Sequence, residues 1–269
     1  MAFTEIIVVR GGGDLATGVV QKFYRAGFPV VVLEVSEPSA IRRTVALCEA
    51  VFGGTAQVED VICQKVSGPG KLEGCWKAGR VPLLVDPNGD TIREIKPSAV
   101  IDAILAKRGT GTSMAMAEIT IALGPGFTAG EDVTAVIETM RGHDLGRLIL
   151  QGSALPNTGI PGEIGGKSTQ RVLRAPAQGV LAVRKRIGEV ARQGEVVFAV
   201  DGQEVRAPFT GLVRGMLRDG MEVPQGMKTA DTDPRTDIDV NTISDKARCL
   251  GGAALEAYLY LRNQKEAPQ

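Results

Sequence analysis

The sequence predicts an α/β protein, and three observations carry that prediction. Short apolar runs alternate with segments of helical periodicity over roughly the first 108 residues, which is typical of a parallel sheet with helical crossovers. A glycine-rich turn joins the first strand run to the first helical segment. The last third instead contains two copies of a glycine-rich strand pattern, so a separate β module is expected there.

Five strands and three helices are expected in the first part. The strand runs cover residues 4–10, 29–35, 58–63, 81–86 and 99–105. One helix is expected between the glycine turn and Gly27, and a short one over 72–78. Between them Ile41, Val45, Cys48 and Phe52 recur at intervals of four, three and four residues, which predicts an amphipathic helix that ends at Gly53 and Gly54.

A glycine-rich middle section and a terminal helix are expected after residue 112. Ten glycines lie between positions 124 and 166, and the apolar runs at 118–123, 133–139 and 147–150 are short, so this section is expected to be β-rich and looped. Thr242 and Asp245 have the spacing of a capping box before a final helix with a stripe of apolar residues: Ala247, Leu250, Ala254, Ala257 and Leu261. Gly251 and Gly252 each cost this helix about 1 kcal/mol relative to Ala. Close packing against another backbone would explain them.

The repeat in the last third has an offset of 32 residues. Seven identities carry it: Arg174, Ala175, Pro176, Gly179, Gly188, Gln193 and Gly194 recur as Arg206, Ala207, Pro208, Gly211, Gly220, Gln225 and Gly226. Two interlocked halves of four strands, related by a pseudo-twofold axis, would suit this pattern. In this respect the segment resembles the biotinyl/lipoyl family of barrel-sandwich modules. Because no Lys lies between Lys185 and Lys228, we expect no biotin or lipoyl attachment and a rigid docking piece.

The expected organisation is therefore a Rossmann-like sheet followed by a β-rich segment, a pseudo-twofold barrel-sandwich (lipoyl-like) module and a C-terminal helix. The corresponding boundaries are 1–112, 113–170, 171–235 and 236–269.

Charge and composition narrow the classes of partner. With 31 basic and 31 acidic side chains the net charge is zero, so no global positive field exists to hold nucleic acid or an anionic membrane. No apolar stretch approaches the roughly 18 residues needed to span a bilayer, and the first residues lack the regions of a signal peptide, so a cytoplasmic location is expected. The four cysteines form no C-x-x-C pair, and no metal site is expected.

The glycine turn is the strongest chemical motif. Gly11, Gly12 and Gly13 precede Asp14, Leu15 and Ala16, which fits the dinucleotide-binding pattern G-x-G-x-x-A between a strand and a helix. The helix start offers free N–H groups to a pyrophosphate, and Glu34 at the end of the second strand would accept from a ribose hydroxyl. The alternative is a glycine turn that serves only helix-strand packing. Asp14 would repel a phosphate unless it points away.

Two further groups of residues are candidates for catalysis, although no role is assigned to any of them. Glu138, Arg141 and His143 lie within six residues at the end of a strand run, and they could form an acid-base or anion-binding cluster. Asp102, Lys107 and Arg108 follow the strand at 99–105, at the sheet edge where open α/β folds bind ligands. Solvated charges without catalytic duty are the alternative for both groups.

Five segments carry a family resemblance, namely residues 9–18, 41–45, 102–107, 138–146 and 243–247. Together they resemble the YqeB family, which is associated with selenium-dependent molybdenum hydroxylases. The N-terminal part is also similar to XdhC-type maturation factors. The resemblance implies an accessory protein that handles a molybdenum cofactor dinucleotide for an apo molybdenum hydroxylase.

Two other functions stay open at this point. An NAD-dependent oxidoreductase would use the same glycine turn, with Glu34 favouring NAD over NADP. A non-catalytic docking scaffold would bind no nucleotide-type small molecule. The residues do not decide whether the protein is an enzyme. The glycine-rich terminal helix suggests a homodimer.

Overall fold

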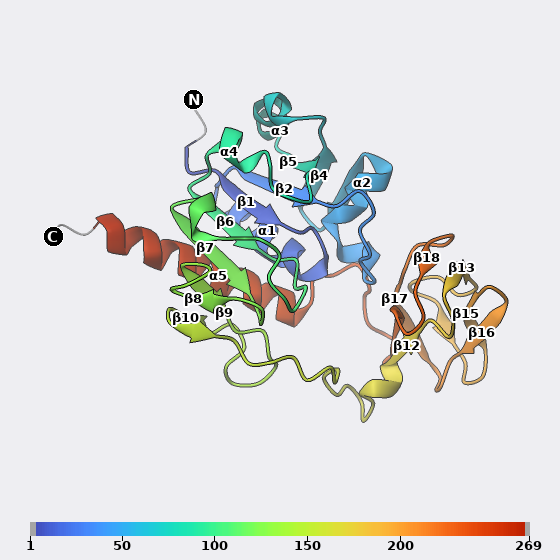
Figure 1. Ribbon diagram of the computed structural model, residues 1–269. Helices are drawn as coiled ribbons and strands as arrows, with labels where there is room; N and C mark the ends of the chain where they lie inside the picture. Colours follow the sequence, from blue (N-terminus) through green and yellow to red (C-terminus); the bar gives the residue numbers. More distant parts are fainter. Residues whose placement is uncertain (1–3, 267–269) are drawn as a thin grey trace. The chain divides into compact units, whose positions relative to one another are not determined.

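The chain folds into two compact units whose segments interleave along the sequence (Figure 1). The structure, a computed structural model, describes residues 4–266. The first unit contains Met1–Pro38, Ala46–Asn157 and Ile243–Gln269, and the second contains Ser39–Val45 and Thr158–Thr242. The expected segments 1–112 and 236–269 thus lie mostly in one unit, and the expected middle segment 113–170 is divided between the two.

The first unit is built on one sheet of nine strands with the order β10-β9-β7-β6-β1-β2-β5-β4-β3. The strands are β1 (Ile7–Arg10), β2 (Val30–Glu34), β3 (Thr55–Val58), β4 (Val61–Lys65), β5 (Val81–Val85), β6 (Ala99–Asp102), β7 (Ile119–Leu123), β9 (Ala135–Ile137) and β10 (Leu148–Ile149). The strands from β9 to β4 in this order run parallel, and only the edge strands β10 and β3 are antiparallel to their neighbours. A pair of short strands, β8 (Thr128–Ala129) and β11 (Gly152–Ser153), forms a separate two-stranded sheet.

Helices and 3-10 turns connect these strands, except for the last helix, which follows all the strands. They are α1 (Asp14–Arg25), η2 (Leu47–Glu49), α2 (Ala50–Gly53), η3 (Pro69–Lys71), α3 (Leu72–Lys77), α4 (Ile92–Ile95), η4 (Met114–Met116) and α5 (Asp245–Glu266). From β1 the chain passes through α1 to β2, and from β5 it returns through α4 to β6 on the other side of β1. Because crossovers between parallel strands are right-handed, these opposite directions place α1 and α4 on opposite faces of the sheet. The core on the α4 side joins Val8, Val31 and Val100 of the sheet to Leu72 of α3 and Ile92 of α4.

The fold class predicted from the sequence is wrong for the middle segment. Residues 119–149 do not form a separate β-rich piece, because β7 pairs in parallel with β6, β9 pairs with β7, and β10 closes the edge. The result is a mixed sheet of nine strands in place of a Rossmann-like sheet confined to residues 1–112. Short apolar runs reveal that strands exist, whereas the choice of neighbour is a long-range contact with no local signal.

The amphipathic helix predicted over residues 41–52 is also wrong. Ala46 is extended, with φ −122° and ψ 116°, and it separates the 3-10 turn η1 (Arg43–Val45) from η2 and the short α2. Phe52 is 40% exposed, and Ile41 belongs to the second unit, where it packs against Gly215. The four apolar residues have the spacing of one helix face, but their side chains belong to two different cores. The single strand expected over 58–63 is likewise a hairpin, since Glu59 turns the chain with φ 51° between β3 and β4.

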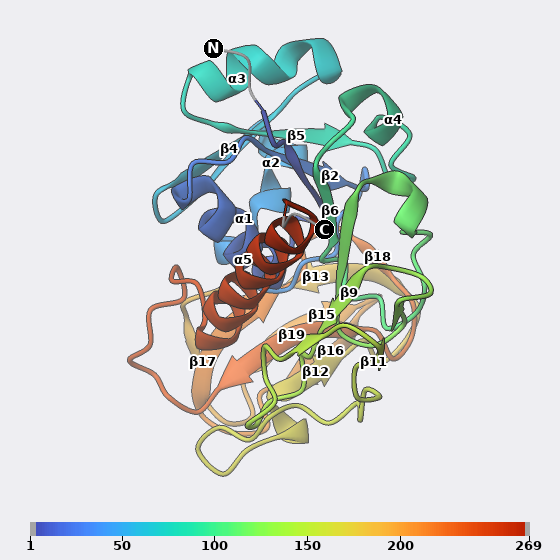
Figure 2. The ribbon, with the colours of Figure 1, turned by 90° about the vertical axis from the view of Figure 1, so that its left-hand side faces the viewer.

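The terminal helix α5 packs directly against α1 (Figure 2). Its predicted stripe is buried, with Ala247, Leu250, Ala254 and Ala257 at 0% exposure. A Cβ added to Gly251 would stand 2.2 Å from the carbonyl oxygen of Gly18, and a Cβ added to Gly18 would stand 2.2 Å from that of Ala247. The two helices therefore meet backbone to backbone. This explains Gly251 within one chain, whereas a Cβ added to Gly252 would meet nothing within 4 Å, so close packing does not account for the second glycine.

The N-terminus of α5 is capped differently from the prediction. The hydroxyl of Ser244 accepts from the N–H of Ala247 at 3.2 Å, which makes Ser244 the capping residue. Thr242 lies outside the helix, and its hydroxyl donates to the carbonyl of Asp239 at 3.1 Å. The capping-box spacing of Thr242 and Asp245 is therefore not used.

The second unit contains two antiparallel sheets of four strands, in the orders β12-β19-β17-β14 and β16-β15-β13-β18. After the 3-10 turn η5 (Thr169–Arg171) the strands are β12 (Val172–Arg174), β13 (Gly179–Val183), β14 (Val190–Ala191), β15 (Val196–Val200), β16 (Gln203–Arg206), β17 (Gly211–Met216), β18 (Glu222–Val223) and β19 (Lys228–Asp233). The structure thus gives two antiparallel sheets where a lipoyl-like barrel-sandwich was expected, and the lipoyl-like part of the fold prediction is corrected accordingly.

The two copies of the repeat exchange equivalent hydrogen bonds across the second unit. The N–H of Gly194 donates to the carbonyl of Ala207, and 32 residues later the N–H of Gly226 donates to that of Ala175, both at 2.9 Å. Further pairs related in the same way link Gly188 to Val213 and Gly220 to Leu181, also at 2.9 Å. All four glycines have positive φ between 79° and 93°. Each copy thus supplies the carbonyl acceptors for N–H groups of the other copy. The positive φ of these four residues accounts for glycine at their positions.

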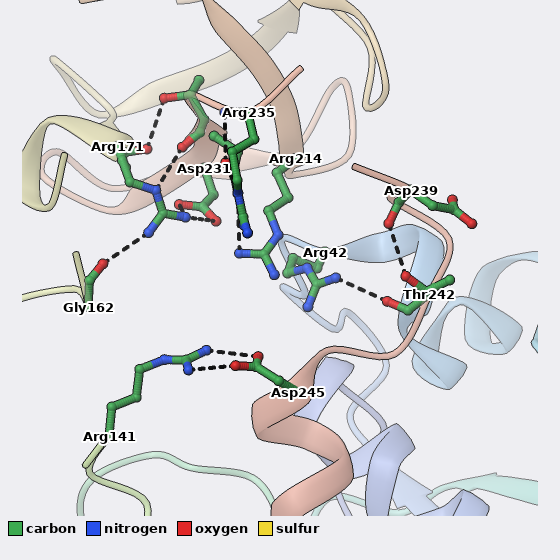
Figure 3. Close-up of polar contacts among 12 residues, drawn as sticks. Arg42, Arg141, Gly162, Arg171, Arg214, Asp231, Arg235, Asp239, Thr242 and Asp245 are labelled. Atoms are coloured by element: carbon green, nitrogen blue, oxygen red, sulfur yellow. Dashed lines mark hydrogen bonds and ion pairs between the residues drawn. The ribbon is translucent and has the colours of Figure 1, made fainter. Parts of the chain in front are cut away.

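A buried arginine anchors the start of this unit (Figure 3). Arg171 donates to the carbonyls of Thr232 and Gly162, each at 3.1 Å, and it lies 3.4 Å from the carboxylate of Asp231. The segment before β12 is therefore fixed to β19 by a satisfied charge, which is a structural role.

Among residues 4–266 no helix combines the length and apolar character required to cross a membrane. Within the same range no group of three or more His, Cys, Asp or Glu side chains is arranged to hold a metal ion.

Candidate functional site at the switch point of the sheet

The site lies where the strand order reverses, between β1 and β6. From β1 the connections run through β2 and β5 on one side and through β6, β7 and β9 on the other, so the loops after β1 and β6 separate at this point. Open α/β sheets bind ligands in the crevice at such a switch point, outside the carboxyl ends of the strands. The glycine turn follows β1 and Asp102 ends β6, so the structure brings these two predicted groups together.

The glycine turn is tight at its first two residues. Gly11 has φ 96°, and its N–H donates to the carbonyl of Leu33 at 2.8 Å. An added Cβ at Gly11 would stand 3.1 Å from the backbone of Ala103, and one at Gly12 would stand 3.0 Å from the backbone nitrogen of Cys48. A side chain at either position would press on neighbouring backbone, and the positive φ of Gly11 adds strain for any other residue.

Gly13 differs from its two neighbours because it faces open space. It precedes α1 with φ −66° and ψ −178°, an extended conformation open to any residue, and an added Cβ would meet nothing within 4 Å. No side chain caps α1 here. The small third position of the motif, Ala16, is fully buried as expected for close helix-strand packing. Leu15 is partly buried in the same first turn.

Glu34 lies beside the turn, as the motif predicts, and already binds it. One carboxylate oxygen accepts from the N–H of Gly12 and the other from that of Val35, both at 2.8 Å. Burial raises the pKa of Glu34, while these two backbone hydrogen bonds lower it and offset part of the effect. The N–H of Gly12 is thus occupied by the protein itself, and the open part of the turn begins at Gly13.

The buried thiol next to the turn is not a nucleophile. Burial raises the pKa of Cys48, and the carboxylates of Glu34, Glu49 and Asp14 raise it further, so the thiol stays protonated at neutral pH. Asp14 is partly buried in the first turn of α1 and acts electrostatically on Cys48. This environment makes Cys48 a structural residue.

Asp102 belongs to a buried network centred on Arg10. The guanidinium of Arg10 donates to the hydroxyl of Thr112 at 2.5 Å and to the carbonyl of Pro87 at 3.0 Å, and it lies 3.9 Å from the carboxylate of Asp102. The hydroxyls of Thr112 and Thr110 donate to Asp102, the former at 2.6 Å. Both charged side chains are nearly inaccessible, at 3% and 2% exposure. The network fixes the loop after β6 to the end of β1, so Asp102 is a positioning residue and not an exposed acid.

Asp86 organises the loop after β5 in a similar way. Its carboxylate accepts from the N–H groups of Gly89, Asp90 and Thr91 at 2.9 to 3.0 Å, and from the hydroxyl of Thr91 at 2.5 Å. Burial alone would raise the pKa of Asp86, but these hydrogen bonds hold it below its ordinary value of 3.8. The ionised carboxylate is therefore the form that stabilises this loop.

Replacing Asp86 by Ala is expected to lower the free energy of unfolding by about 2 kcal/mol at pH 7, because three backbone donors lose their acceptor. The folded pKa is depressed, so the contribution is present above the ordinary carboxyl value and is lost as the pH falls through the folded value. Urea unfolding followed by Trp76 fluorescence at pH 7 and pH 3 measures both effects. Asp90→Ala, at an exposed residue of the same loop, should stay within about 0.5 kcal/mol. A difference between the Asp86 variant and the native protein that is as large at pH 3 as at pH 7 would contradict the assignment.

Glu138 is a structural carboxylate. It is 3% exposed and accepts from the N–H groups of Thr139, Met140 and Leu155 at 2.6, 2.6 and 2.7 Å. All three donors are backbone N–H groups, so Glu138 fixes the chain after β9. A role as general base is not what this geometry favours.

Arg141 and His143 are separated by the structure. The Arg141 guanidinium forms two hydrogen bonds with Asp245 at the first residue of α5, at 2.9 and 3.1 Å (Figure 3). His143 is exposed. Glu138, Arg141 and His143 therefore do not form the acid-base or anion-binding cluster that the sequence suggested.

The structure places Lys107 and Arg108 on the exposed loop after β6. Gly126 packs against the backbone of Arg108, where an added Cβ would stand 2.7 Å from its nitrogen. Lys107 acts electrostatically on Lys246, in the first turn of α5, as do Arg141, Asp14 and Glu138. All four of these residues were predicted from the sequence as members of a site, and all four influence the pKa of Lys246.

Sequence reasoning missed Arg10 and Lys246. Arg10 ends an apolar strand, and a charge directly before a glycine turn is a signal for a buried partner. Lys246 lies in the first turn of a helix, where the positive helix end disfavours a cation. This unfavourable position of a lysine was the feature of the sequence that could have drawn attention to it.

A cavity of about 680 Å³ lies on another part of the first unit. Its lining includes Asn88, Asp90, Arg93, Lys96 and Ser113. None of the site residues predicted from the sequence lines it, and its charged side chains are exposed.

Comparison with known proteins gives one close relative. The chain is 47% identical over 261 residues to "Uncharacterized protein YqeB" from Escherichia coli (strain K12). The alignment covers 97% of this chain and 48% of the relative, so the chain spans about half the length of the curated protein that it matches. No family model matches the chain.

The solved structures that align with the chain are distant. One is an aspartoacylase family protein from Mesorhizobium loti, at 10% identity over 86% of this chain and 85% of that one, with a TM-score of 0.26. Another is a succinylglutamate desuccinylase from a Silicibacter species, at 11% identity over 87% of each chain, with a TM-score of 0.25. Likeness at this level carries no argument about fold or activity.

These findings correct the family resemblance inferred from the sequence. The relative is uncharacterised and supplies no link to molybdenum, selenium or cofactor maturation. No family model matches the chain, so the XdhC-type and biotinyl/lipoyl resemblances gain no support from the comparison either. The assignment to a molybdenum hydroxylase accessory family is therefore withdrawn. The expected partners, cofactors and cytoplasmic location stay predictions.

Proposed function

We propose that the first unit binds a nucleotide through its diphosphate, at the start of α1 and beside Glu34. The observation that carries the proposal is the open space at Gly13. The two preceding glycines are closed by backbone, whereas at Gly13 an added Cβ meets nothing within 4 Å, and α1 begins there without a side-chain cap. Helix N-termini of this kind attract phosphate through their free N–H groups and positive dipole end.

Three further features support a nucleoside attached to the diphosphate. Glu34 stands next to the turn, where a carboxylate accepts from a ribose hydroxyl. Val35, directly after β2, and Ile104, two residues after β6, are 41% and 40% exposed. Exposed apolar side chains at a carboxyl edge offer a base a surface on which to pack. Because a carboxylate repels a 2′-phosphate, NAD-type ligands are favoured over NADP-type ligands.

Gly13→Asp tests the diphosphate site without disturbing the fold. Aspartate fits the extended conformation and would cap α1, so the variant should be at least as stable as the native protein. Its carboxylate would occupy the place of a phosphate, and we expect at least tenfold weaker binding of NADH or ADP-ribose. Fluorescence titration with NADH and thermal shift with ADP-ribose measure this, since a ligand at 100 times its dissociation constant adds about 2.7 kcal/mol.

Gly13→Ala is the matched control. It adds a Cβ into the same open space without charge, so binding should change less than threefold. Equal binding by the native protein and Gly13→Asp would remove the turn from the site. Absence of any nucleotide-dependent shift in the native protein would favour the docking scaffold instead.

A further inference from the structure

The cavity of about 680 Å³ in the first unit is lined by three short segments around α4, the helix labelled in Figure 2. They are residues 88–90 after β5, residues 92–97 of α4 and the turn behind it, and residues 113–117 around η4. The volume falls in the range of about 300 to 1,000 Å³ that is typical of small-molecule sites. Neither the glycine turn nor Glu34 lines this cavity, so it is distinct from the proposed nucleotide site.

The apolar part of the lining belongs to the protein core. Ile92 is 2% exposed and lies in the core on the α4 side of the sheet, and Met116 and Ala117 pack against that same core. Pro97, which also lines the cavity, is buried. An apolar group of a ligand would displace water from these side chains, which is favourable.

Hydrogen bonds hold the segments around the cavity in place. The carboxylate of Asp86 accepts from the N–H groups of Gly89 and Asp90 at 2.9 and 3.0 Å, which fixes the loop after β5. The N–H of Met114 donates to the carbonyl of Asp132 at 2.9 Å, which fixes the segment around η4. Because these segments are ordered before a ligand arrives, little entropy is lost when one binds.

The polar side chains of the lining are left open to a ligand. Within residues 4–266 five of them are exposed and form no hydrogen bond and no ion pair with the protein, namely Asn88, Asp90, Arg93, Lys96 and Ser113. All three segments contribute to this set. Exposed charges elsewhere in the same unit form ion pairs, as Arg25 does with Asp60.

Lys96 has a backbone conformation that is rare for lysine. It follows α4 with φ 49° and ψ 61°, in the left-handed region. Glycine or asparagine is usual at such a position, because a larger side chain strains the backbone there. Strained residues of this kind gather at ligand sites. Glycine at position 96 would remove the ammonium and relieve the strain together, so this position separates binding from stability.

The charges of the lining select the ligand. Arg93 and Lys96 outnumber Asp90, so the cavity favours a carboxylate, which a guanidinium can bind through two hydrogen bonds. Asp90 disfavours a second negative charge and offers an acceptor to an ammonium group. Asp90 precedes α4 and Lys96 follows it, so charges of opposite sign flank the helix. Asn88 and Ser113 add an amide and a hydroxyl that can bind a peptide group.

We propose that this cavity binds a small zwitterion with an apolar side chain, the chemistry shared by amino acids and short peptides. Arg93 and Lys96 bind its carboxylate, and Asp90 binds its ammonium group. Its apolar side chain packs on Ile92 and Met116. The inference does not rest on the proposed function, because the two sites share no lining residue.

Calorimetric titration of the full chain tests the ligand class. The probes are L-leucine and L-leucyl-L-leucine, and we expect at least one to bind with a dissociation constant below about 1 mM. A response to leucine indicates an amino acid site, and a response to the dipeptide alone indicates a peptide site. Two analogues of leucine and two of the dipeptide, each lacking either the ammonium group or the carboxylate, should bind at least tenfold more weakly. Binding of neither probe overturns the proposal, and so does equal binding by the analogue without an ammonium group.

Substitutions locate the bound probe. Arg93→Gln and Lys96→Gly should each weaken binding at least fivefold, and the melting temperature of Lys96→Gly should not fall, because glycine relieves the strained backbone. Asp90→Asn should weaken binding of the zwitterion but not of the analogue without an ammonium group. Lys71→Gln removes an exposed cation outside the cavity and is the matched control, which should bind as the native protein does. Unchanged binding by both Arg93→Gln and Lys96→Gly would place the probe elsewhere and overturn the proposal.

The two proposals of this protein's ligands fail independently. Gly13→Asp should weaken binding of NADH and leave binding of the zwitterion unchanged. Loss of zwitterion binding in Gly13→Asp would overturn the separate site in the cavity. A native protein that binds the zwitterion without any response to NADH or ADP-ribose would uphold the cavity site and overturn nucleotide binding.

Discussion

Replacing Gly251 by Ala is expected to lower the free energy of unfolding of the first unit by about 3 kcal/mol, because the new methyl group has no room. Its Cβ would stand 2.2 Å from the carbonyl oxygen of Gly18, and backbone cannot rotate aside as a side chain can. The helices α1 and α5 would have to separate. That movement would also loosen the apolar stripe of α5.

Gly252→Ala is the matched control at the neighbouring position. An added Cβ there meets nothing within 4 Å, so the substitution should stabilise the helix by about 0.5 to 1 kcal/mol through its higher helix propensity. Guanidinium unfolding followed by the fluorescence of Trp76, the single tryptophan and a residue of the first unit, measures both variants. Equal stability of the two variants would show that the helices do not meet at Gly251.

The second large effect is expected for Asp102→Ala, which should cost about 3 to 5 kcal/mol. Removal of the carboxylate leaves the guanidinium of Arg10 buried without a counter-ion, and the hydroxyls of Thr110 and Thr112 lose their acceptor. The loop after β6 would detach from the glycine turn. Nucleotide binding should weaken together with stability.

Two comparisons isolate the cause of that loss. Glu73→Ala removes a carboxylate from an exposed pair with Lys77, and it should change stability by no more than about 0.5 kcal/mol. The double variant Arg10→Met with Asp102→Leu replaces both charges by apolar groups, and it should be less destabilised than Asp102→Ala alone. If the double variant unfolds more readily than the single one, the network is more than a buried ion pair and its removal disrupts the loop itself.

The glycine turn and its acidic partner could be predicted because their signals are local. A strand, a turn that demands glycine and a helix start follow one another within a few residues, and Glu34 ends the next strand of the same sheet. The candidate cluster of Glu138, Arg141 and His143 was a weaker inference, since residues that are close in the sequence can point their side chains in different directions. The structure turns Glu138 inward to backbone donors, pairs Arg141 with Asp245 and leaves His143 exposed.

By itself the sequence determined the parallel strands around the glycine turn, the buried stripe of the last helix and the 32-residue repeat, because each is written in a period or spacing that short-range sterics and burial impose. Only the tertiary structure decided that β7 and β9 extend the first sheet, that residues 41–52 serve two units, and that α5 packs on α1. Those outcomes depend on which distant surfaces fit together. Such a fit depends on packing between distant segments, such as Gly18 against Gly251. The residues that neighbour each glycine in the sequence do not indicate that contact.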